Sequence, residues 1–215
     1  MGAPLFPMFL KLAGRQSLVV GAGSVGNAKT ASLLHAGARV TVVAPHAAEP
    51  VRRLALQQTI TWIAREFRGA DLAGMFLVIA ATSDPSVNRA VFLEAQARGV
   101  LCNSVDDPPH CDFYFPSVLR RGDLQIAVST AGQSPALAQR VRRELEEQFD
   151  DATSNWVKQL GELRREIIAT QPPSEERKNL LLKLAYTERE ALARQKTKLA
   201  SPEPLAELQV REAEP

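Results

Sequence analysis

Short apolar runs rich in β-branched residues alternate with longer helical stretches over the first hundred residues. The pattern predicts five strands, at 17–20, 39–43, 60–63, 76–80 and 100–103. The predicted helices run from the glycine-rich segment 21–26 to about His35, over 47–57, and from Asp84 or Pro85 to Arg98. Apolar strands separated by helices are typical of a parallel sheet covered on both faces, so the predicted fold class is α/β.

A different pattern begins after Pro108-Pro109. Two strands, 113–118 and 124–129, are predicted on either side of a tight turn at 121–123. A polar loop over 130–134 follows them. A small α+β region is therefore expected after the parallel sheet.

Helices are predicted for the rest of the chain. Ser134 followed by Pro135 is a helix-start signature, and this helix should end near Phe149. Helical sequence resumes at residue 151, with breaks at 171–174 and 201–204. The last ~15 residues are rich in Pro, Glu and Ala and are expected to be frayed or disordered.

Composition narrows the class of protein. The 215 residues are 45% hydrophobic and 23% charged, which is ordinary for a soluble globular chain and excludes fibrous or disordered classes. With 26 basic and 24 acidic residues, the chain lacks the basic field that nucleic-acid binding needs. No apolar run reaches the ~18 residues of a membrane span, and the N-terminus lacks signal-peptide features. Two cysteines make no disulfide framework, so a reducing, cytoplasmic location is expected.

Gly21-Ala22-Gly23-Ser24-Val25-Gly26 matches the pattern G-x-G-x-x-G between a predicted strand and a predicted helix. In that motif Gly21 permits the tight turn, Gly23 lets a pyrophosphate approach the backbone, and Gly26 lets the helix pack closely. The amides at the helix N-terminus would hold the phosphates. A purely structural glycine turn is the alternative, and the strand–loop–helix context favours dinucleotide binding.

The acidic residue that usually binds the ribose is missing from the end of the second strand. The chain reads Ala44-Pro45-His46 there, and Glu49 comes three residues late. The ribose must therefore meet backbone groups around Pro45 and His46, or a hydroxyl; His46 could equally be an ordinary loop residue. No arginine lies at the strand end to receive a 2′-phosphate, so NAD is favoured over NADP.

Two later loops also follow predicted strands and should face the same crevice. The first contains Thr82, a candidate cofactor contact, and Asp84, whose default role is a helix cap. The second contains Asp106 and Asp107. A carboxylate there could accept a proton while hydride leaves to the cofactor, could bind a metal in transit, or could merely form a turn.

Several motifs, in register along the chain, together resemble one known family. They are V-V-G-A-G-S-V-G-N-A-K, V-I-A-A-T-S-D, C-N-S-V-D-D-P, F-Y-F-P-S and I-A-V-S-T-A-G-Q-S-P-A-L-A. Over about residues 8–150 the chain resembles the precorrin-2 dehydrogenase/sirohydrochlorin ferrochelatase family, the siroheme synthase module of tetrapyrrole biosynthesis. The resemblance implies oxidation of precorrin-2 to sirohydrochlorin with NAD and, in many members, insertion of ferrous iron to give siroheme.

The resemblance also implies roles for single residues. The family's key aspartate falls on Asp106, as a proton acceptor in dehydrogenation, chelation or both, and Asn103 would line the substrate cleft. The serine-rich loop would contribute substrate contacts from Ser129, Thr130 and Ser134. The family's cofactor contacts fall on Ser24, Val25, Pro45 and His46.

A substrate with several carboxylates calls for cations, and guanidinium groups pair with carboxylates bidentately. Five arginines are candidates, although a solvated surface charge is the commoner role of each: Arg120, Arg121, Arg140, Arg142 and Arg143. No His/Cys cluster predicts a resident metal site. His110 and Cys111 could touch a passing ferrous ion, but loop roles explain both. A tetrapyrrole brings its own nitrogens, so the sequence leaves chelation open.

The resemblance further implies a homodimer with a Rossmann domain at 1–113, a dimerisation region at 114–150 and a helical domain at 151–215. Exchange with a partner would cover the edges of the two later strands. The residues after 150 are too few for a methyltransferase domain as well. The alternative class is an NAD(H)-sensing Rossmann regulatory module without catalysis, which would not need the Asp106 loop. A dehydrogenase for another small acid lacks an obvious His or Lys general acid.

Overall fold

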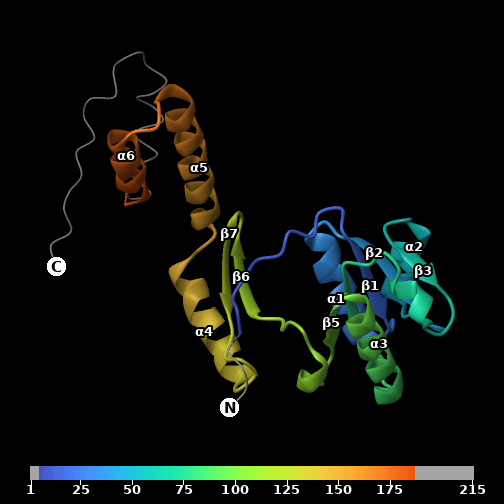
Figure 1. The fold of residues 1–215 in the computed structure, drawn as a ribbon. Helices are drawn as coiled ribbons and strands as arrows, with labels where there is room; N and C mark the ends of the chain where they lie inside the picture. Colours follow the sequence, from blue (N-terminus) through green and yellow to red (C-terminus); the bar gives the residue numbers. More distant parts are fainter. Residues whose placement is uncertain (1–4, 187–215) are drawn as a thin grey trace. The chain divides into compact units, whose positions relative to one another are not determined.

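The structure is a computed structural model, and it describes residues 5–186. The chain divides into two compact units, one ending at Phe115 and the other beginning at Pro116. Figure 1 draws both units and labels most of their helices and strands.

The first unit is a five-stranded parallel sheet in the order β3-β2-β1-β4-β5. Its strands are β1 (Gln16–Val20), β2 (Arg39–Val43), β3 (Thr61–Ile63), β4 (Leu77–Ala80) and β5 (Leu101–Ser104). Its helices are α1 (Ser24–His35), α2 (Glu49–Leu56) and α3 (Pro85–Arg98), with the 3-10 turns η1 (Gly69–Leu72) and η2 (Pro108–His110). The predicted Rossmann-type α/β sheet is confirmed.

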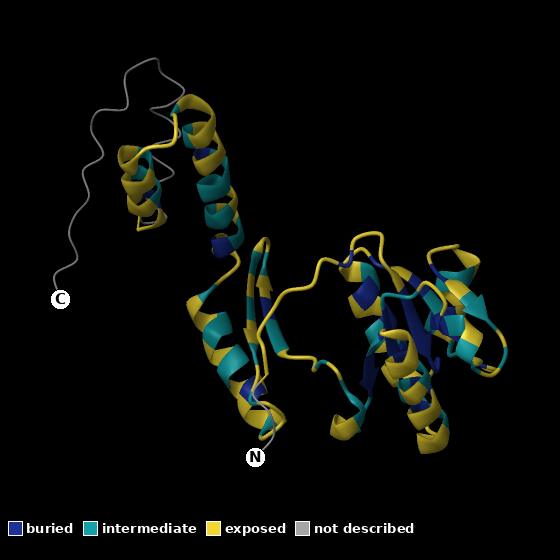
Figure 2. Ribbon diagram, in the orientation of Figure 1, coloured by how far each residue is buried: buried dark blue, intermediate teal, exposed yellow. Residues whose placement is uncertain are grey.

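Helices cover both faces of this sheet, and the strands are its most buried part (Figure 2). Val19 of β1 belongs to an apolar cluster with Leu33 of α1 and Val51 of α2. On the other face, Val78 of β4 belongs to a cluster with Val91 of α3. Because successive strand residues point to opposite faces, a continuous apolar strand supplies both cores.

Helix α2 begins at Glu49, two residues later than the predicted start at Ala47. The N–H of Ala48 donates to the carbonyl oxygen of Ala22 at 3.0 Å, so this amide belongs to a contact with the glycine loop. Pro50 lies in the first turn, where a missing N–H costs nothing.

The second unit contains an antiparallel pair, β6 (Ser117–Arg121) and β7 (Leu124–Val128), followed by α4 (Pro135–Gln148), α5 (Ala152–Thr170) and α6 (Glu175–Ala185). Helix α4 packs on the strand pair. Helices α5 and α6 form their own small core around Leu163 and Leu184. The predicted helical C-terminal part and its break at 171–174 are confirmed; the predicted break at 201–204 and the tail lie outside the described residues.

The prediction of a strand at 113–118 is wrong, because β6 begins only at Ser117 and extends to Arg121. The carbonyl oxygen of Phe113 accepts a hydrogen bond from the Asn103 side chain, and Pro116 has no N–H to donate to a strand ladder. The turn is therefore only Gly122-Asp123, with Gly122 at φ +57°.

Within residues 5–186, no helix is both long enough and apolar enough to span a bilayer.

Candidate functional site

Strands β1 and β4 are neighbours at the point where the strand order of the sheet reverses, so their carboxyl ends lie side by side. Strands β2 and β3 lie beyond β1, whereas β5 lies beyond β4. Helix α1 packs against β1 on one face and α3 against β4 on the other. Such a switch point opens a crevice at the carboxyl ends of the strands, where open α/β sheets bind their ligands.

Two glycines of the loop after β1 are required by close backbone contacts. Gly21 has φ +102°, and a Cβ there would lie 2.4 Å from the carbonyl oxygen of Ala81. A Cβ on Gly26 would lie 2.1 Å from the carbonyl oxygen of Gly21. The N–H of Gly21 donates to the Val43 carbonyl oxygen at 2.9 Å, which ties the loop to β2. These backbone contacts fix the conformation of the loop after β1.

Gly23 differs from these two, because a Cβ there would meet no atom within 4 Å. It is the N-cap of α1, where no side chain caps the first turn and no acidic residue lies in it. Ser24 and Val25 are exposed beside it. Uncapped helix amides next to open space fit the pyrophosphate of a dinucleotide.

The loop after β2 lies against the glycine loop through the Ala48–Ala22 hydrogen bond. Pro45 and His46 are exposed in it, whereas Ala44 is buried and accepts a hydrogen bond from the Trp62 indole at 3.0 Å. Glu49 forms an ion pair with Arg52 at 3.2 Å and so does not substitute for the missing ribose-binding acid. Backbone groups of this loop remain the available ribose contacts.

The loop after β4 is held by Asn88 of α3, a residue that the sequence prediction missed. Asn88 is 7% exposed; its Oδ1 lies 2.8 Å from the Thr82 hydroxyl, and its Nδ2 donates to the Thr82 carbonyl oxygen at 3.1 Å. The Thr82 hydroxyl is thus already engaged in hydrogen bonding within this segment. Asp84 caps α3 as predicted, accepting from the Ser86 N–H at 2.8 Å, and this bonding with Ser86 lowers the pKa of its carboxyl.

Asn103, at the carboxyl end of β5, is buried rather than open to a cleft. Its side chain donates to the Phe113 carbonyl oxygen at 2.8 Å and is 6% exposed. It therefore holds the segment after η2 against the end of β5. The Cys111 thiol lies 3.1 Å from the Ser104 carbonyl oxygen in the same turn, and burial raises its pKa.

The two aspartates after β5 have different surroundings. Asp107 Oδ2 lies 2.6 Å from Nδ1 of His110, whose ring also meets the edge of Phe92. Asp106 is exposed at φ +60°, and within the described residues its carboxylate makes no hydrogen bond. Aspartate tolerates this left-handed conformation better than most residues. Of the two, only Asp106 presents a carboxylate that is free for other chemistry.

The three hydroxyls predicted for substrate binding lie in the second unit and shape the loop before α4. Ser129 accepts a hydrogen bond from the Ala131 N–H, Thr130 from the Ser134 N–H, and Ser134 from the Leu137 N–H, at 3.1, 3.0 and 3.2 Å. Ser134 is thus the N-cap of α4, as predicted. Each hydroxyl keeps a hydrogen that it can donate.

Three of the five candidate arginines are paired within the second unit. Arg140 and Arg142 bond Glu144 and Glu146 on the same helix, and Arg121 lies 3.4 Å from Asp151. Arg120 and Arg143 are exposed, and neither forms an ion pair among residues 5–186. They are the better candidates for contact with an acidic ligand.

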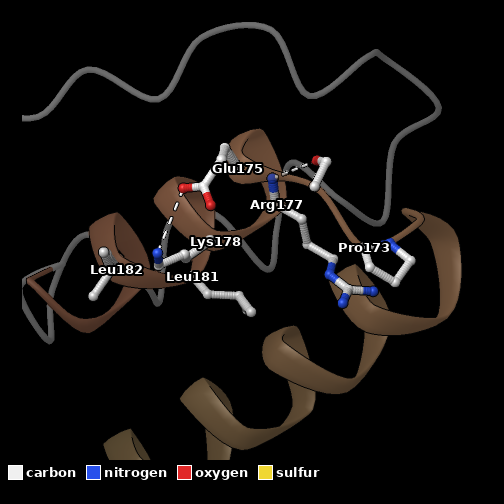
Figure 3. A pocket seen from close by; sticks show the side chains of 7 residues that line it. Pro173, Glu175, Arg177, Lys178, Leu181 and Leu182 are labelled. Carbon is white, nitrogen blue, oxygen red and sulfur yellow. Dashed lines mark hydrogen bonds and ion pairs between the residues drawn. The ribbon is translucent and has the colours of Figure 1, made fainter.

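Over the same range, no group of three or more His, Cys, Asp or Glu side chains could hold a metal ion. A hollow lies at the start of α6, lined by Pro173, Arg177, Leu181 and neighbouring residues (Figure 3). Its volume is about 750 Å³ and it contains none of the predicted site residues.

Comparisons with known proteins agree with this geometry. A family model for NAD(P)-binding domains matches residues 8–117, and a model for the central part of sirohaem biosynthesis proteins matches residues 121–148. The siroheme synthase of Neisseria meningitidis serogroup C is 48% identical over 141 residues, which are 66% of this chain and 29% of the relative. Siroheme synthase 1 of Aeromonas salmonicida is 37% identical over 87% of this chain and 41% of its own length.

The chain thus spans about a third of the length of these curated relatives. The solved structure of SirC, a precorrin-2 dehydrogenase, matches with a TM-score of 0.77 and 26% identity, over 91% of this chain and 98% of that one. The first unit is an NAD(P)-binding domain, and the motif resemblance is confirmed: the chain belongs to the NAD(P)-binding family of siroheme synthases and precorrin-2 dehydrogenases.

Proposed function

We propose that this chain oxidises precorrin-2 to sirohydrochlorin, using NAD. The observation that carries the proposal is the exposed, unbonded carboxylate of Asp106 at the same sheet edge as the glycine loop. The match to nearly the whole length of a precorrin-2 dehydrogenase supports it.

The reaction removes a hydride and a proton from precorrin-2, giving sirohydrochlorin, reduced nicotinamide and a proton. When bound, NAD supplies the hydride acceptor. Asp106 accepts the proton, because its carboxylate is exposed and makes no hydrogen bond within the described residues. Gly23, Ser24 and Val25 hold the pyrophosphate, and Pro45 and His46 contact the ribose. Thr82 lines the cofactor crevice through its backbone.

The residues proposed to act on the substrate have three roles. Ser129, Thr130 and Ser134 donate hydroxyl hydrogens to the substrate, and Arg120 and Arg143 attract its carboxylates. Asn103 acts as a positioning residue, since its amide nitrogen already bonds the Phe113 carbonyl oxygen.

NAD is the proposed cofactor rather than NADP. The loop after β2 offers no free cation at the strand end: Arg52 is paired with Glu49, and Arg53 lies ten residues beyond Val43. A 2′-phosphate would therefore lack the arginine partner that NADP sites normally provide.

The test is anaerobic: the protein with enzymatically generated precorrin-2 and NAD, following reduced nicotinamide and the sirohydrochlorin spectrum together. We expect both to appear at matching rates. A regulatory NAD(H)-sensing module would bind NAD and leave precorrin-2 unchanged, and that result would reject the proposal. Replacing NAD by NADP in the same assay should lower kcat/KM.

The proposal that ferrous iron is a second substrate rests on the same carboxylate, that of Asp106. Metal insertion releases two protons from the tetrapyrrole for each ion bound, and Asp106 is free to accept them one after the other. Adding ferrous or cobaltous ion to ready-made sirohydrochlorin, with and without protein, measures this activity. An unchanged rate of spectral conversion would show a dehydrogenase alone.

The protein is proposed to be a cytoplasmic homodimer. Both cysteines are free, Cys102 being fully buried with its pKa raised to about 12 by that burial, as suits a reducing compartment. Strands β6 and β7 pair only with each other among residues 5–186, which leaves two edges for a second copy. Light scattering at micromolar concentration should give twice the mass of one chain; the mass of a single chain would contradict the dimer.

A further inference from the structure

Lys29 of α1 is a cation that the dinucleotide motif does not use. It lies three residues after Gly26, and its side chain is half-buried. Its ammonium nitrogen lies 3.5 Å from the centroid of the Phe115 ring, whose edge-to-face partner is Phe113. Drawing a lysine ammonium group partly out of water costs free energy unless its charge is matched.

The charge of Lys29 is only partly matched within the chain. Burial lowers its pKa, and the nearby acidic groups of Asp106 and Cys111 act in the opposite direction. Between residues 5 and 186, Lys29 forms no ion pair. The aromatic ring orients the ammonium group and leaves its hydrogen-bond donors without an anionic acceptor.

Lys29 and Asp106 belong to segments at the same edge of the sheet. Lys29 lies on the helix that follows β1 and Asp106 in the loop that follows β5, so both segments start from the carboxyl edge. Asp106 is close enough for its charge to act on Lys29. Phe113, whose ring meets that of Phe115, is anchored to β5 by the Asn103 hydrogen bond, which fixes the lysine's surroundings relative to Asp106.

We infer that Lys29 is a substrate-binding residue whose ammonium group holds a carboxylate of an acidic tetrapyrrole beside Asp106. This inference rests on the proposed function and adds to it a residue that determines which substrates bind. The Lys29 ammonium group forms an ion pair with the substrate carboxylate in a half-buried position, where a charge-assisted hydrogen bond is stronger than at the surface.

The test measures sirohydrochlorin binding by absorbance titration without NAD, and separately NAD binding. In Lys29→Met, which keeps the apolar stem, we expect the Kd for sirohydrochlorin to rise about tenfold and the Kd for NAD to stay unchanged. In turnover, KM for precorrin-2 should rise more than kcat falls. Lys29→Arg should recover most of the binding, because it restores the charge.

Lys11→Met is the matched control, since it removes an exposed lysine near the amino end of β1, away from the glycine loop. It should bind sirohydrochlorin like the unaltered protein. Unchanged binding in Lys29→Met would overturn the inference, as would a parallel loss of NAD binding that Lys29→Arg does not repair. Failure of the unaltered protein to bind sirohydrochlorin would instead reject the proposed function itself.

Discussion

Replacing Asp106 with asparagine is expected to lower kcat for precorrin-2 oxidation by about 10²-fold or more, the usual contribution of a positioned proton acceptor. The amide cannot accept the proton, but it keeps the size of the carboxylate. Asparagine also tolerates the φ of +60° at this position, whereas alanine would add backbone strain to the chemical change. Thermal melting and NAD titration should therefore match the unaltered protein.

Asp107→Asn is the matched control for this prediction. Its side-chain oxygen can still accept from His110, so the turn should keep its shape and kcat should change only a few-fold. The assay is the anaerobic turnover of precorrin-2 at saturating NAD. If Asp106→Asn retains full activity, or if Asp107→Asn is the inactive variant, Asp106 is not the proton acceptor.

The sequence pattern predicted the first unit better than the second, for a physical reason. Parallel strands are buried on both faces, so each appears as an unbroken apolar run with a strong signal. Phe113-Tyr114-Phe115 has the same local composition but forms no strand. A hydrogen bond from Asn103, ten residues earlier, and the missing N–H of Pro116 decide its conformation. The local sequence pattern around Phe113 carries no information about the hydrogen bond from Asn103.

In the candidate site, too, some features were predictable from the sequence and others were not. The glycine loop follows from a motif whose residues are neighbours in the chain, and its strand–loop–helix context was predictable. Lys29 was not, because its contact with Phe115 joins segments far apart in the chain. Asn88 lies only six residues after Thr82, but its hydrogen bonds depend on how the loop after β4 folds against the start of α3. The exposure of Asp106, and the pairing of Asp107 with His110, likewise needed the turn geometry.

Two glycine substitutions in one loop should differ greatly in their cost to stability, and both should weaken NAD binding. Gly21→Val places a Cβ 2.4 Å from the Ala81 carbonyl oxygen at φ +102°, so it should destabilise the fold by several kcal/mol and abolish NAD binding with it. Gly23→Val places its Cβ in open space at an extended N-cap, so its stability cost should be about 1 kcal/mol or less.

Gly23→Val should nevertheless weaken NAD binding by about a hundredfold, about 2.8 kcal/mol, because the side chain fills the space that the pyrophosphate needs against the α1 amides. Calorimetric titration with NAD and thermal melting of the same samples separate the two effects. A stable Gly23→Val variant that binds NAD normally would show that the open space beside Gly23 is not the phosphate site. The three glycines would then serve only the packing of α1 on the sheet, where Gly21 and Gly26 already have their own contacts.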